Sequence, residues 1–474
     1  MSHPSSPSLP APFLDALRAL LPGERLRTDP AECWSYGYDN SRQQARPDAV
    51  VFPESHDEVV SIVRLCNEHG VPLVARGRGT GTTGATVPVA GGLVLSTERM
   101  NRILEIRPAD RYLVAQPGVL NATVQAVAGE AGFFWPPDPT SATFATIGGN
   151  LACNSAGPRA VKYGTPRDNV FGLRAVTGAG ESLRTGVFTS KGVVGYDFTR
   201  LLVGSEGTLA IITEATLRLT PLPEAKRTLQ AIYRDIESAS EAVAAIMAQP
   251  VTPCALEFID GRAIEMIRDH AETDLPDDAG AMLMIEVDGP EHGLDASVAA
   301  VEAAARHPGL LRLVAARDAG EVAALWATRK ALSPALRKVA PKKINEDVVV
   351  PVSHIPDLIR GLERLSQTFG IPIVNFGHAG NGNIHVNLLF DPDAPGQREA
   401  AEKCLDAVFD LVLSLRGTLS GEHGIGLVKR EFVGREIEPV TLALMRRIKR
   451  EFDPKGILNP GKGLPEGGGE ESRK

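Results

Sequence analysis

Two glycine-rich segments near the C-terminal end of the chain hold residue types that bind metals and move protons. The first, residues 377–387, contains His378 and His385, and the second contains Glu422 and His423. Two imidazoles and a carboxylate can hold a divalent metal, and the remaining imidazole can act as a base. The alternative is a glycine-rich turn whose histidines only cap backbone groups. The adjacent Glu-His pair favours the metal site.

Apolar runs on either side of the first segment indicate how its histidines are positioned. Residues 371–376 and 384–390 have the composition of strands, and the glycines and asparagines between them predict a β-hairpin. Because side chains alternate along a strand, His385 and Asn387 are expected on one face. His378 is expected across the loop, from where it can point into the same space.

A second kind of motif, a loop rich in glycine, follows a predicted strand–helix–strand unit. The capping box that begins at Ser55 opens the helix, residues 71–75 form the strand, and Arg76 to Gly84 holds four glycines. Backbone N–H groups in such a loop can cradle a pyrophosphate, and Arg76 and Arg78 can supply charge. The spacing is not that of a dinucleotide fold or a Walker loop, so a plain surface loop stays open as an alternative.

Two further clusters of small polar residues, 146–157 and 204–208, lie in the same half of the chain. Residues 134–164 show no periodicity over a long stretch, which is typical of a functional loop. Three such loops can converge on one extended ligand that carries phosphates and a polar ring edge.

Bulk properties limit the class of protein. The chain has 474 residues, 43% of them hydrophobic and 23% charged, with a net charge of -8. This composition predicts a globular protein of two or three domains and argues against a nucleic-acid partner. We find no apolar run long enough to span a membrane, no secretory signal pattern and no CxxC pair, so a cytoplasmic location with free thiols is expected.

The second half of the chain has a different pattern of predicted secondary structure. Strand-like runs at 228–233, 255–259 and 281–287 alternate with alanine-rich helices at 236–247 and 294–305. This pattern predicts an antiparallel sheet with helices, an α+β layer.

Together the motifs resemble those of the FAD-binding family that includes vanillyl-alcohol oxidase and p-cresol methylhydroxylase. Residues 76–84 resemble its pyrophosphate loop, residues 136–141 and 147–150 its flavin-proximal segments, and residues 204–212 the segment beside the adenosine half. The hairpin motif, the Gly-Glu-His-Gly motif and the closing segment 453–462 are similar to the D-lactate, D-2-hydroxyglutarate and glycolate dehydrogenase branch.

The resemblance implies an α+β fold with a two-subdomain FAD-binding domain and an α+β cap domain made of an antiparallel sheet plus helices. The expected organisation is an FAD-binding domain at 1–225, a substrate or cap domain at 226–420, a segment at 421–464 that returns to the flavin, and a disordered tail at 465–474. The loop contains no histidine for a covalent flavin bond, so non-covalent FAD is expected. The implied cofactor-binding residues are Arg76, Gly77, Arg78, Gly79, Thr80, Gly81, Pro137, Asp138, Thr143, Gly148, Gly149, Asn150, Asn154, Ser155, Gly157, Glu206, Gly207, Ile211, Ile212 and Asn459.

The resemblance also assigns roles around the substrate. His378, His385 and Glu422 would ligate a divalent metal, with zinc the expected ion, and His423 would be the catalytic base. Glu422 acting only as an orienter of a histidine stays open. The implied substrate-binding residues are Arg329, Ser333, Lys343 and Asn387.

The substrate assignments leave two further questions open. Arg329 in a solvated position or in an ion pair is the alternative to a role in substrate binding. Asn345 occupies the place where relatives that act on dicarboxylates carry a lysine, so whether Lys343 or Asn345 faces the substrate is undecided.

The predicted function is that of an FAD-dependent dehydrogenase that oxidises a D-2-hydroxy acid, of the D-lactate, D-2-hydroxyglutarate or glycolate type, to the 2-oxo acid. The alternatives are an oxidase that uses oxygen, a metal-dependent hydrolase without flavin, and a non-catalytic flavin-binding subunit. A quinone, a cytochrome and an electron-transfer protein are the candidate electron acceptors, and a homodimer is the candidate assembly.

Overall fold

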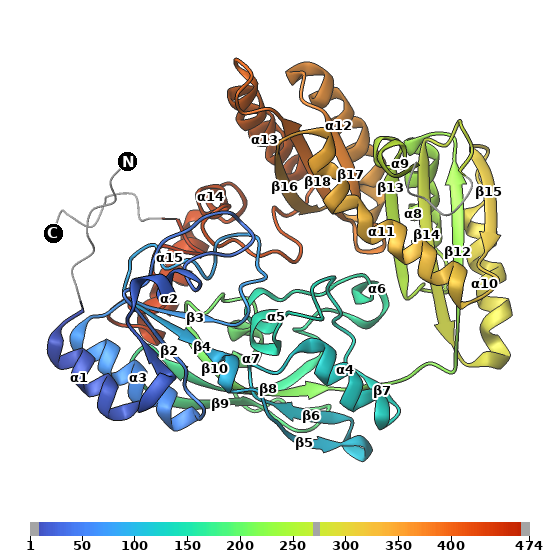
Figure 1. The fold of residues 1–474 in the computed structure, drawn as a ribbon. Coiled ribbons are helices and arrows are strands. Elements are labelled where there is room, and N and C mark those ends of the chain that lie inside the picture. Colours follow the sequence, from blue (N-terminus) through green and yellow to red (C-terminus); the bar gives the residue numbers. More distant parts are fainter. Residues whose placement is uncertain (1–8, 269–274, 466–474) are drawn as a thin grey trace. The chain divides into compact units, whose positions relative to one another are not determined.

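The computed structural model describes residues 9–268 and 275–465, apart from a few side chains in two helices (Figure 1). The chain divides into two compact units. The first unit contains Met1–Ala156, Gly164–Leu222 and Glu422–Lys474, and the second contains Gly157–Tyr163 and Pro223–Gly421. Apart from residue 465, the tail expected at 465–474 lies outside the described residues.

A four-stranded sheet with the order β1-β2-β4-β3 forms one layer of the first unit. Its elements are β1 (Leu26–Arg27), β2 (Ala49–Val51), β3 (Leu73–Arg76) and β4 (Leu93–Ser96), with the helices α1 (Ala11–Leu20), α2 (Pro30–Trp34) and α3 (His56–His69). The strands β2, β4 and β3 are parallel, and α3 connects β2 to β3. The Ser55 hydroxyl accepts a hydrogen bond from the Glu58 N–H at the start of α3, as the capping box predicts. The apolar faces of α1 and α3 pack in one core with the sheet.

A five-stranded antiparallel sheet with the order β5-β6-β10-β8-β9 forms the other layer of this unit. Its strands are β5 (Ile103–Arg107), β6 (Tyr112–Ala115), β8 (Val170–Thr177), β9 (Ser182–Gly186) and β10 (Ala210–Arg218), and β7 (Phe133–Phe134) pairs with β11 (Thr220–Pro221) beside it. The helices are α4 (Asn121–Glu130), α5 (Ile147–Cys153), α7 (Phe198–Leu202), α14 (Val433–Glu436) and α15 (Pro439–Phe452). Trp135 is fully buried in this core, and its indole N–H donates to the Asn169 carbonyl over 2.9 Å.

The end of the chain returns to the edge of the first sheet. The N–H of Leu73 in β3 donates to the Ile457 carbonyl, and the N–H of Asn459 donates back to the Leu73 carbonyl, each over 2.8 Å. The turn before this pairing depends on Asp453, whose carboxylate accepts hydrogen bonds from the N–H groups of Ile457 at 3.0 Å and Leu458 at 2.8 Å.

The second unit is built on a seven-stranded antiparallel sheet with the order β15-β12-β14-β13-β17-β18-β16. Its strands are β12 (Ala225–Tyr233), β13 (Ala255–Asp260), β14 (Ala281–Gly289), β15 (Leu310–Ala315), β16 (Lys342–Val349), β17 (Ile373–His378) and β18 (Asn383–Phe390). The helices are α6 (Ala160–Tyr163), α8 (Ile236–Ala248), α9 (Gly261–Ile267), α10 (Glu291–Ala305), α11 (Ala319–Val339), α12 (Ile355–Phe369) and α13 (Gln397–Ser414).

The two faces of this sheet carry different helices. Ile232 packs in one core with the apolar residues of α9 and α11. Tyr233, the next residue of β12, points to the opposite face, where its hydroxyl donates to the Ala305 carbonyl of α10 over 2.7 Å. One face of the sheet is therefore covered by α9 and α11 and the other by α10. Within the described part of the chain, none of the helices has the length and hydropathy needed to cross a membrane.

Asp453→Ala is expected to lower the free energy of unfolding by about 2–3 kcal/mol, because it leaves two buried N–H groups without their acceptor and removes the carboxylate that pairs with Lys449. The midpoint of urea denaturation, followed by circular dichroism, measures this loss. Asp393→Ala removes an exposed carboxylate and should change stability by no more than about 0.5 kcal/mol. Equal midpoints for the two variants would contradict the role of Asp453.

Candidate active site

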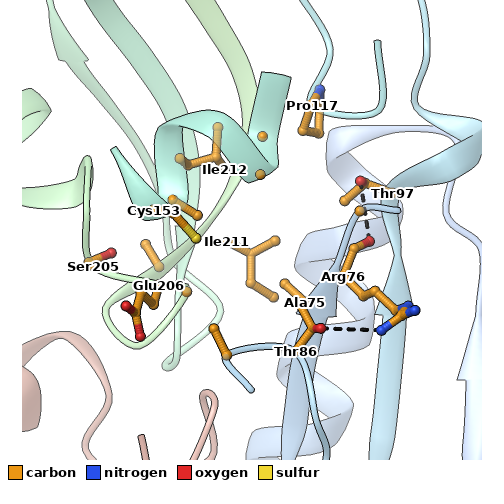
Figure 2. Close-up of a pocket in the computed structure, with 17 residues that line it drawn as sticks. Ala75, Arg76, Thr86, Thr97, Pro117, Cys153, Ser205, Glu206, Ile211 and Ile212 are labelled. Atoms are coloured by element: carbon orange, nitrogen blue, oxygen red, sulfur yellow. Dashed lines mark hydrogen bonds between the residues drawn. The ribbon is translucent and has the colours of Figure 1, made fainter. Parts of the chain in front are cut away.

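A cleft in the first unit lies where three glycine-rich segments meet (Figure 2). It contains about 630 Å³ of space free of protein atoms, part of it open to solvent. Figure 2 shows Ser205, Glu206 and Cys153 on one side and Arg76 and Thr97 on the other. The lining comes from the end of β3 and the loop after it, the start of α5, the turn before β10 and the first residues of β10.

Two glycines let the backbone approach closely enough to form these walls. A Cβ atom on Gly77 would lie 2.3 Å from the Thr146 hydroxyl oxygen, and one on Gly148 would lie 2.7 Å from the Pro117 Cβ. Each position therefore excludes any side chain, and the cleft keeps a surface of bare backbone. Such a surface suits a phosphate-bearing ligand, because it presents N–H groups without side chains in the way.

Arg76 is part of the wall and also a brace for the loop. Its side chain is buried, and its Nη1 atom donates to the Tyr38 carbonyl at 2.7 Å and to the Thr86 hydroxyl at 3.2 Å. Burial lowers the pKa of the guanidinium from its ordinary value, with Asp39 opposing this effect. Arg78 is half exposed and pairs with Glu98 over 3.7 Å.

Of the predicted cofactor residues, eight line the cleft and the others do not. Those that line it are Arg76, Gly77, Gly148, Gly149, Glu206, Gly207, Ile211 and Ile212. Those outside the lining are Arg78, Gly79, Thr80, Gly81, Pro137, Asp138, Thr143, Asn150, Asn154, Ser155, Gly157 and Asn459. The sequence analysis missed Ala75, Ala85, Thr86, Thr97, Pro117, Ala152, Cys153, Ser205 and Ala210. Four of these, Ala75, Cys153, Ser205 and Ala210, are direct neighbours of a predicted residue, and this position was the available signal.

Glu206 connects the cleft to the Gly-Glu-His-Gly segment. Its carboxylate accepts hydrogen bonds from the N–H groups of Ile425 and Gly426, and the neighbouring backbone is held by Asn459, whose amide donates to the Glu206 carbonyl over 2.7 Å. Burial raises the pKa of Glu206, while these two N–H groups oppose the rise. The carboxylate thus faces the turn after His423.

The segment itself is tied to loops of the same unit. The Ser155 hydroxyl donates to the Glu422 carbonyl at 3.1 Å, and the Thr83 hydroxyl donates to the His423 carbonyl at 3.3 Å. Thr83 belongs to the glycine-rich loop after β3. Backbone contacts therefore fix the segment that carries the predicted base.

In the second unit, the predicted hairpin is present as β17 and β18, joined by a short 3-10 turn. His378 is the last residue of β17, across the turn from His385. His378 and His385 are both buried, and their ring centroids lie 5.3 Å apart. Cross-strand pairing places His385 opposite Phe376, which aligns it with His378 on the same face.

Glu422 follows Gly421, the last residue of this unit, and a peptide bond keeps consecutive Cα atoms about 3.8 Å apart. The Gly421 N–H donates to Asp347 of β16, which fixes where the chain leaves the sheet. The ligand atoms of His378, His385 and Glu422 lie within 4.8 Å of one another. A set of two imidazoles and one carboxylate in this arrangement suits a divalent metal such as zinc.

A carboxylate that the sequence analysis missed touches this set. Glu257 of β13 is 1% exposed, and its Oε1 atom lies 2.5 Å from the His378 Nδ1 atom. Burial alone would raise the pKa of Glu257, but its electrostatic and hydrogen-bond contacts with His378 and Arg329 hold this pKa below its ordinary value. The available signal was a lone glutamate in the apolar strand 255–259, because an ionised side chain buried in a sheet needs a partner.

The predicted substrate-binding residues lie on the same face of the sheet or on α11. Arg329 donates from Nε to Glu257 over 2.7 Å, and its guanidinium carbon lies 4.9 Å from the centre of the Phe376 ring. The ion pair that the sequence analysis held as an alternative is therefore present. Ser333 belongs to α11, and its side chain lies outside the described residues.

Asn387 is fully buried, and its amide is engaged within the sheet. It donates to the carbonyls of Val374 and His385, each at 3.1 Å, and it accepts a hydrogen bond from Asn345 at 2.7 Å. Asn345 is the direct cross-strand neighbour of Asn387, whereas Lys343 is paired with Leu389.

Comparison with known proteins gives the class to which this geometry belongs. Residues 47–186 match FAD binding domains, and residues 222–463 match the C-terminal domain of FAD linked oxidases. The chain therefore belongs to the family of FAD-linked oxidases. The expected α+β fold, with its FAD-binding domain, is confirmed.

Individual relatives narrow the class further. The chain is 40% identical to glycolate oxidase subunit GlcD of Bacillus subtilis (strain 168), over 90% of this chain and 91% of that protein. It is 36% identical to D-2-hydroxyglutarate dehydrogenase of Xanthomonas citri pv. viticola, over 95% of this chain and 96% of that protein. The fold is similar to that of p-cresol methylhydroxylase, with a TM-score of 0.76 and 18% identity over 96% of both chains.

The protein is thus an FAD-dependent oxidoreductase related to enzymes that act on hydroxy acids. This assignment sets aside the hydrolase without flavin. The cleft fits the cofactor, because the cradle at Gly77 lies inside the part of the chain that matches FAD binding domains.

Gly77→Ala is expected to weaken FAD binding by roughly 5- to 150-fold, because overpacking costs about 1–3 kcal/mol and the added methyl group meets the Thr146 hydroxyl. Titration of the deflavinated protein with FAD measures the affinity. Gly129→Ala lies in α4 with no atom near the added methyl group, and it should bind FAD as the wild type does. Equal affinity for Gly77→Ala and the wild type would refute the cradle.

Proposed function

We propose that the protein is a dehydrogenase that oxidises a D-2-hydroxy acid of the glycolate, D-lactate or D-2-hydroxyglutarate type to the 2-oxo acid. The single observation that carries this proposal is the buried pair of imidazoles on the β17–β18 hairpin, with a carboxylate within ligand distance, in a chain that also has an FAD-binding domain. The printed names of the relatives support the substrate class.

Two groups supply chemistry that side chains do not. The cleft of the first unit would hold FAD without a covalent link, and the flavin would supply the acceptor for the hydride from C2 of the acid. A divalent metal, with zinc the expected ion, would be held by His378, His385 and Glu422 and would lower the pKa of the substrate hydroxyl. The donor set and the orientation of His378 by Glu257 fit such an ion.

The chain's own residues have three tasks in this proposal. His423 accepts the hydroxyl proton, and the hydrogen bond from Thr83 to its carbonyl fixes the backbone from which the imidazole extends. Arg329 holds the substrate carboxylate and so selects the face of C2 that is oxidised. Asn387, whose amide is bonded inside the sheet, stabilises the position of His385 on the same strand.

The size of the acid is part of the proposal. The family resemblance puts Asn345 rather than Lys343 at the position of the lysine of relatives that act on dicarboxylates, and we take Asn345 as this position because its amide is bonded to Asn387. A neutral amide offers a second carboxylate no charge, which favours the shorter acids, glycolate and D-lactate. The acceptor of the electrons is proposed to be a quinone, a cytochrome or an electron-transfer protein, with oxygen as the alternative.

Anaerobic mixing with a panel of hydroxy acids tests this function. Glycolate and D-lactate should bleach the flavin absorbance, D-2-hydroxyglutarate should do so more slowly, and L-lactate should have little effect. Prior treatment with a metal chelator should slow the bleaching by at least about tenfold, since the hydroxyl then keeps its high pKa. Reoxidation by oxygen, compared with a quinone analogue, then distinguishes an oxidase from a dehydrogenase.

The outcomes separate the parts of the proposal. If no hydroxy acid reduces the flavin, the proposed activity is wrong. If the flavin bleaches equally fast after the metal has been removed, the activity stands and the catalytic metal is rejected.

His423→Asn should keep its FAD and lower the rate of flavin reduction by about 10²- to 10⁴-fold, because the base is lost while the cleft is unchanged. Stopped-flow absorbance measures this rate. His292→Asn, an exposed change on α10, serves as the matched control and should reduce its flavin at the wild-type rate. Normal reduction in His423→Asn would remove this residue from the mechanism.

A further inference from the structure

Glu257 is a buried carboxylate whose two oxygen atoms are bound to different partners. Oε1 lies 2.5 Å from the Nδ1 atom of His378, and Oε2 accepts a hydrogen bond from the Nε atom of Arg329 at 2.7 Å. The residue is 1% exposed, so these partners rather than water compensate its charge. One partner belongs to the proposed metal ligands and the other to the proposed substrate-binding residues.

The sheet register explains why this carboxylate reaches both groups. Antiparallel pairing places Phe258 of β13 opposite Gly377 and Ile259 opposite Phe376, so Glu257 lies level with His378. The helix α11 packs on this face through Leu332 and Leu336, which brings Arg329 over the same strands.

The contact fixes which nitrogen of His378 is available. An ionised carboxylate only accepts hydrogen bonds, so its partner Nδ1 carries the proton. The lone pair of the neutral ring is then on Nε2, at the opposite end of the imidazole, where a metal can take it. The other tautomer would leave a proton at the position of the metal.

The contact also determines how Arg329 presents its charge. With Nε bonded to Glu257 and the Phe376 ring against the guanidinium, the planar group has one orientation. Among the described residues, we find no other hydrogen bond of this guanidinium. Its two terminal nitrogens are therefore left for the carboxylate of a substrate, which can accept from both.

We propose that Glu257 is a positioning residue that couples the two halves of substrate recognition. One oxygen holds His378 in the tautomer that binds metal, and the other aims Arg329 at the carboxylate of the hydroxy acid. The inference rests on the proposed function and adds a residue to it. Loss of Glu257 should weaken metal binding and substrate binding together, although Glu257 touches neither ligand.

Glu257→Gln is the variant that tests this coupling, because it keeps the shape of the side chain. Its amide puts an NH2 donor at one of the two oxygen positions, so it can accept from His378 or from Arg329 in the present geometry but not from both. We expect the affinity for Zn²⁺ alone to fall by about 10- to 100-fold, as measured by competition with a chromophoric chelator on metal-free protein. We also expect the KM for glycolate or D-lactate to rise by about tenfold or more, with FAD content unchanged.

Glu286→Gln is the matched control. Glu286 is equally buried on the neighbouring strand β14, and it accepts hydrogen bonds from Thr228 and from Trp326, which lies on the same helix as Arg329. It contacts neither His378 nor Arg329, so the control variant should keep the wild-type Zn²⁺ affinity and KM. Equal losses in the two variants would show a merely structural role and would overturn the proposal.

Arg329→Met separates the two arms of the experiment. It should raise the KM and leave the Zn²⁺ affinity within about twofold of wild type, and the Glu257→Gln/Arg329→Met double variant should show no further rise in KM. Additive effects on KM, or unchanged Zn²⁺ affinity in folded Glu257→Gln, would overturn the coupling. The Zn²⁺ affinity is measured without turnover, so it does not depend on the proposed activity. Failure of the proposed activity would be seen in a different measurement, as a wild-type flavin that no hydroxy acid reduces. Wild-type protein without Zn²⁺ affinity would overturn the role of Glu257 at the metal.

Discussion

The register of the antiparallel sheet in the second unit is the constraint on which the chemistry of that unit depends. A polar row runs across the face under α9 and α11, through Glu257, His378, His385 and Asn387, on strands whose other residues on that face are mostly apolar. A slip of one residue in the register of any of these strands would turn the polar residues of that strand to the opposite face of the sheet. The apolar neighbours, packed against α9 and α11, oppose such a slip, since it would expose them or bury charges without partners.

The first unit meets a different constraint, which is to hold segments from distant parts of the chain around one cleft. The C-terminal segment adds to the edge of β3 through Ile457 and Asn459, and Asn459 also holds the carbonyls of Ala85 and Glu206. Lys462, which is buried, donates to the Asn459 side chain over 2.6 Å, and burial lowers the pKa of this lysine to about 8. These contacts are mostly between buried polar groups, so the geometry of hydrogen bonds, as well as packing, fixes the position of the C-terminal segment beside the cleft.

Local signals made much of the fold predictable. The strands predicted at 255–259 and 281–287 begin at the residues where β13 and β14 begin, and the hairpin was recognised from its glycines. The helix α5 was missed because two adjacent glycines and an asparagine argue against a helix. Here tertiary packing of Ile147 and Leu151 outweighs propensity. Residues 157–163 were assigned to the first domain, whereas their contacts group them with the second unit, which no local pattern indicates.

The candidate site was predictable to the extent that its residues lie in compact motifs. His378, His385 and Glu422 come from two short segments and were found, whereas Glu257 lies 121 residues before its partner His378 and has no motif of its own. Arg76 was assigned to the ligand, but its guanidinium also braces the loop through Tyr38 and Thr86, which a loop sequence does not reveal. Residues that are distant in the sequence and meet only in the folded chain cannot be predicted from the spacing within a motif.

Hydrogen bonds hold the backbone of the Gly-Glu-His-Gly motif at successive residues. Gly421 is held by Asp347 in the second unit, and the carbonyls of Glu422 and His423 are held by Ser155 and Thr83 in the first. The backbone of the motif is thus fixed residue by residue, with each unit supplying hydrogen bonds to its own part. The roles proposed for Glu422 and His423, a metal ligand and a base on adjacent residues, would require such control, because consecutive side chains diverge and small rotations of the backbone move both. The glycine at position 424 follows from the same need, since a Cβ there would meet the Glu206 carboxylate, which must stay close to accept the N–H groups of the next turn.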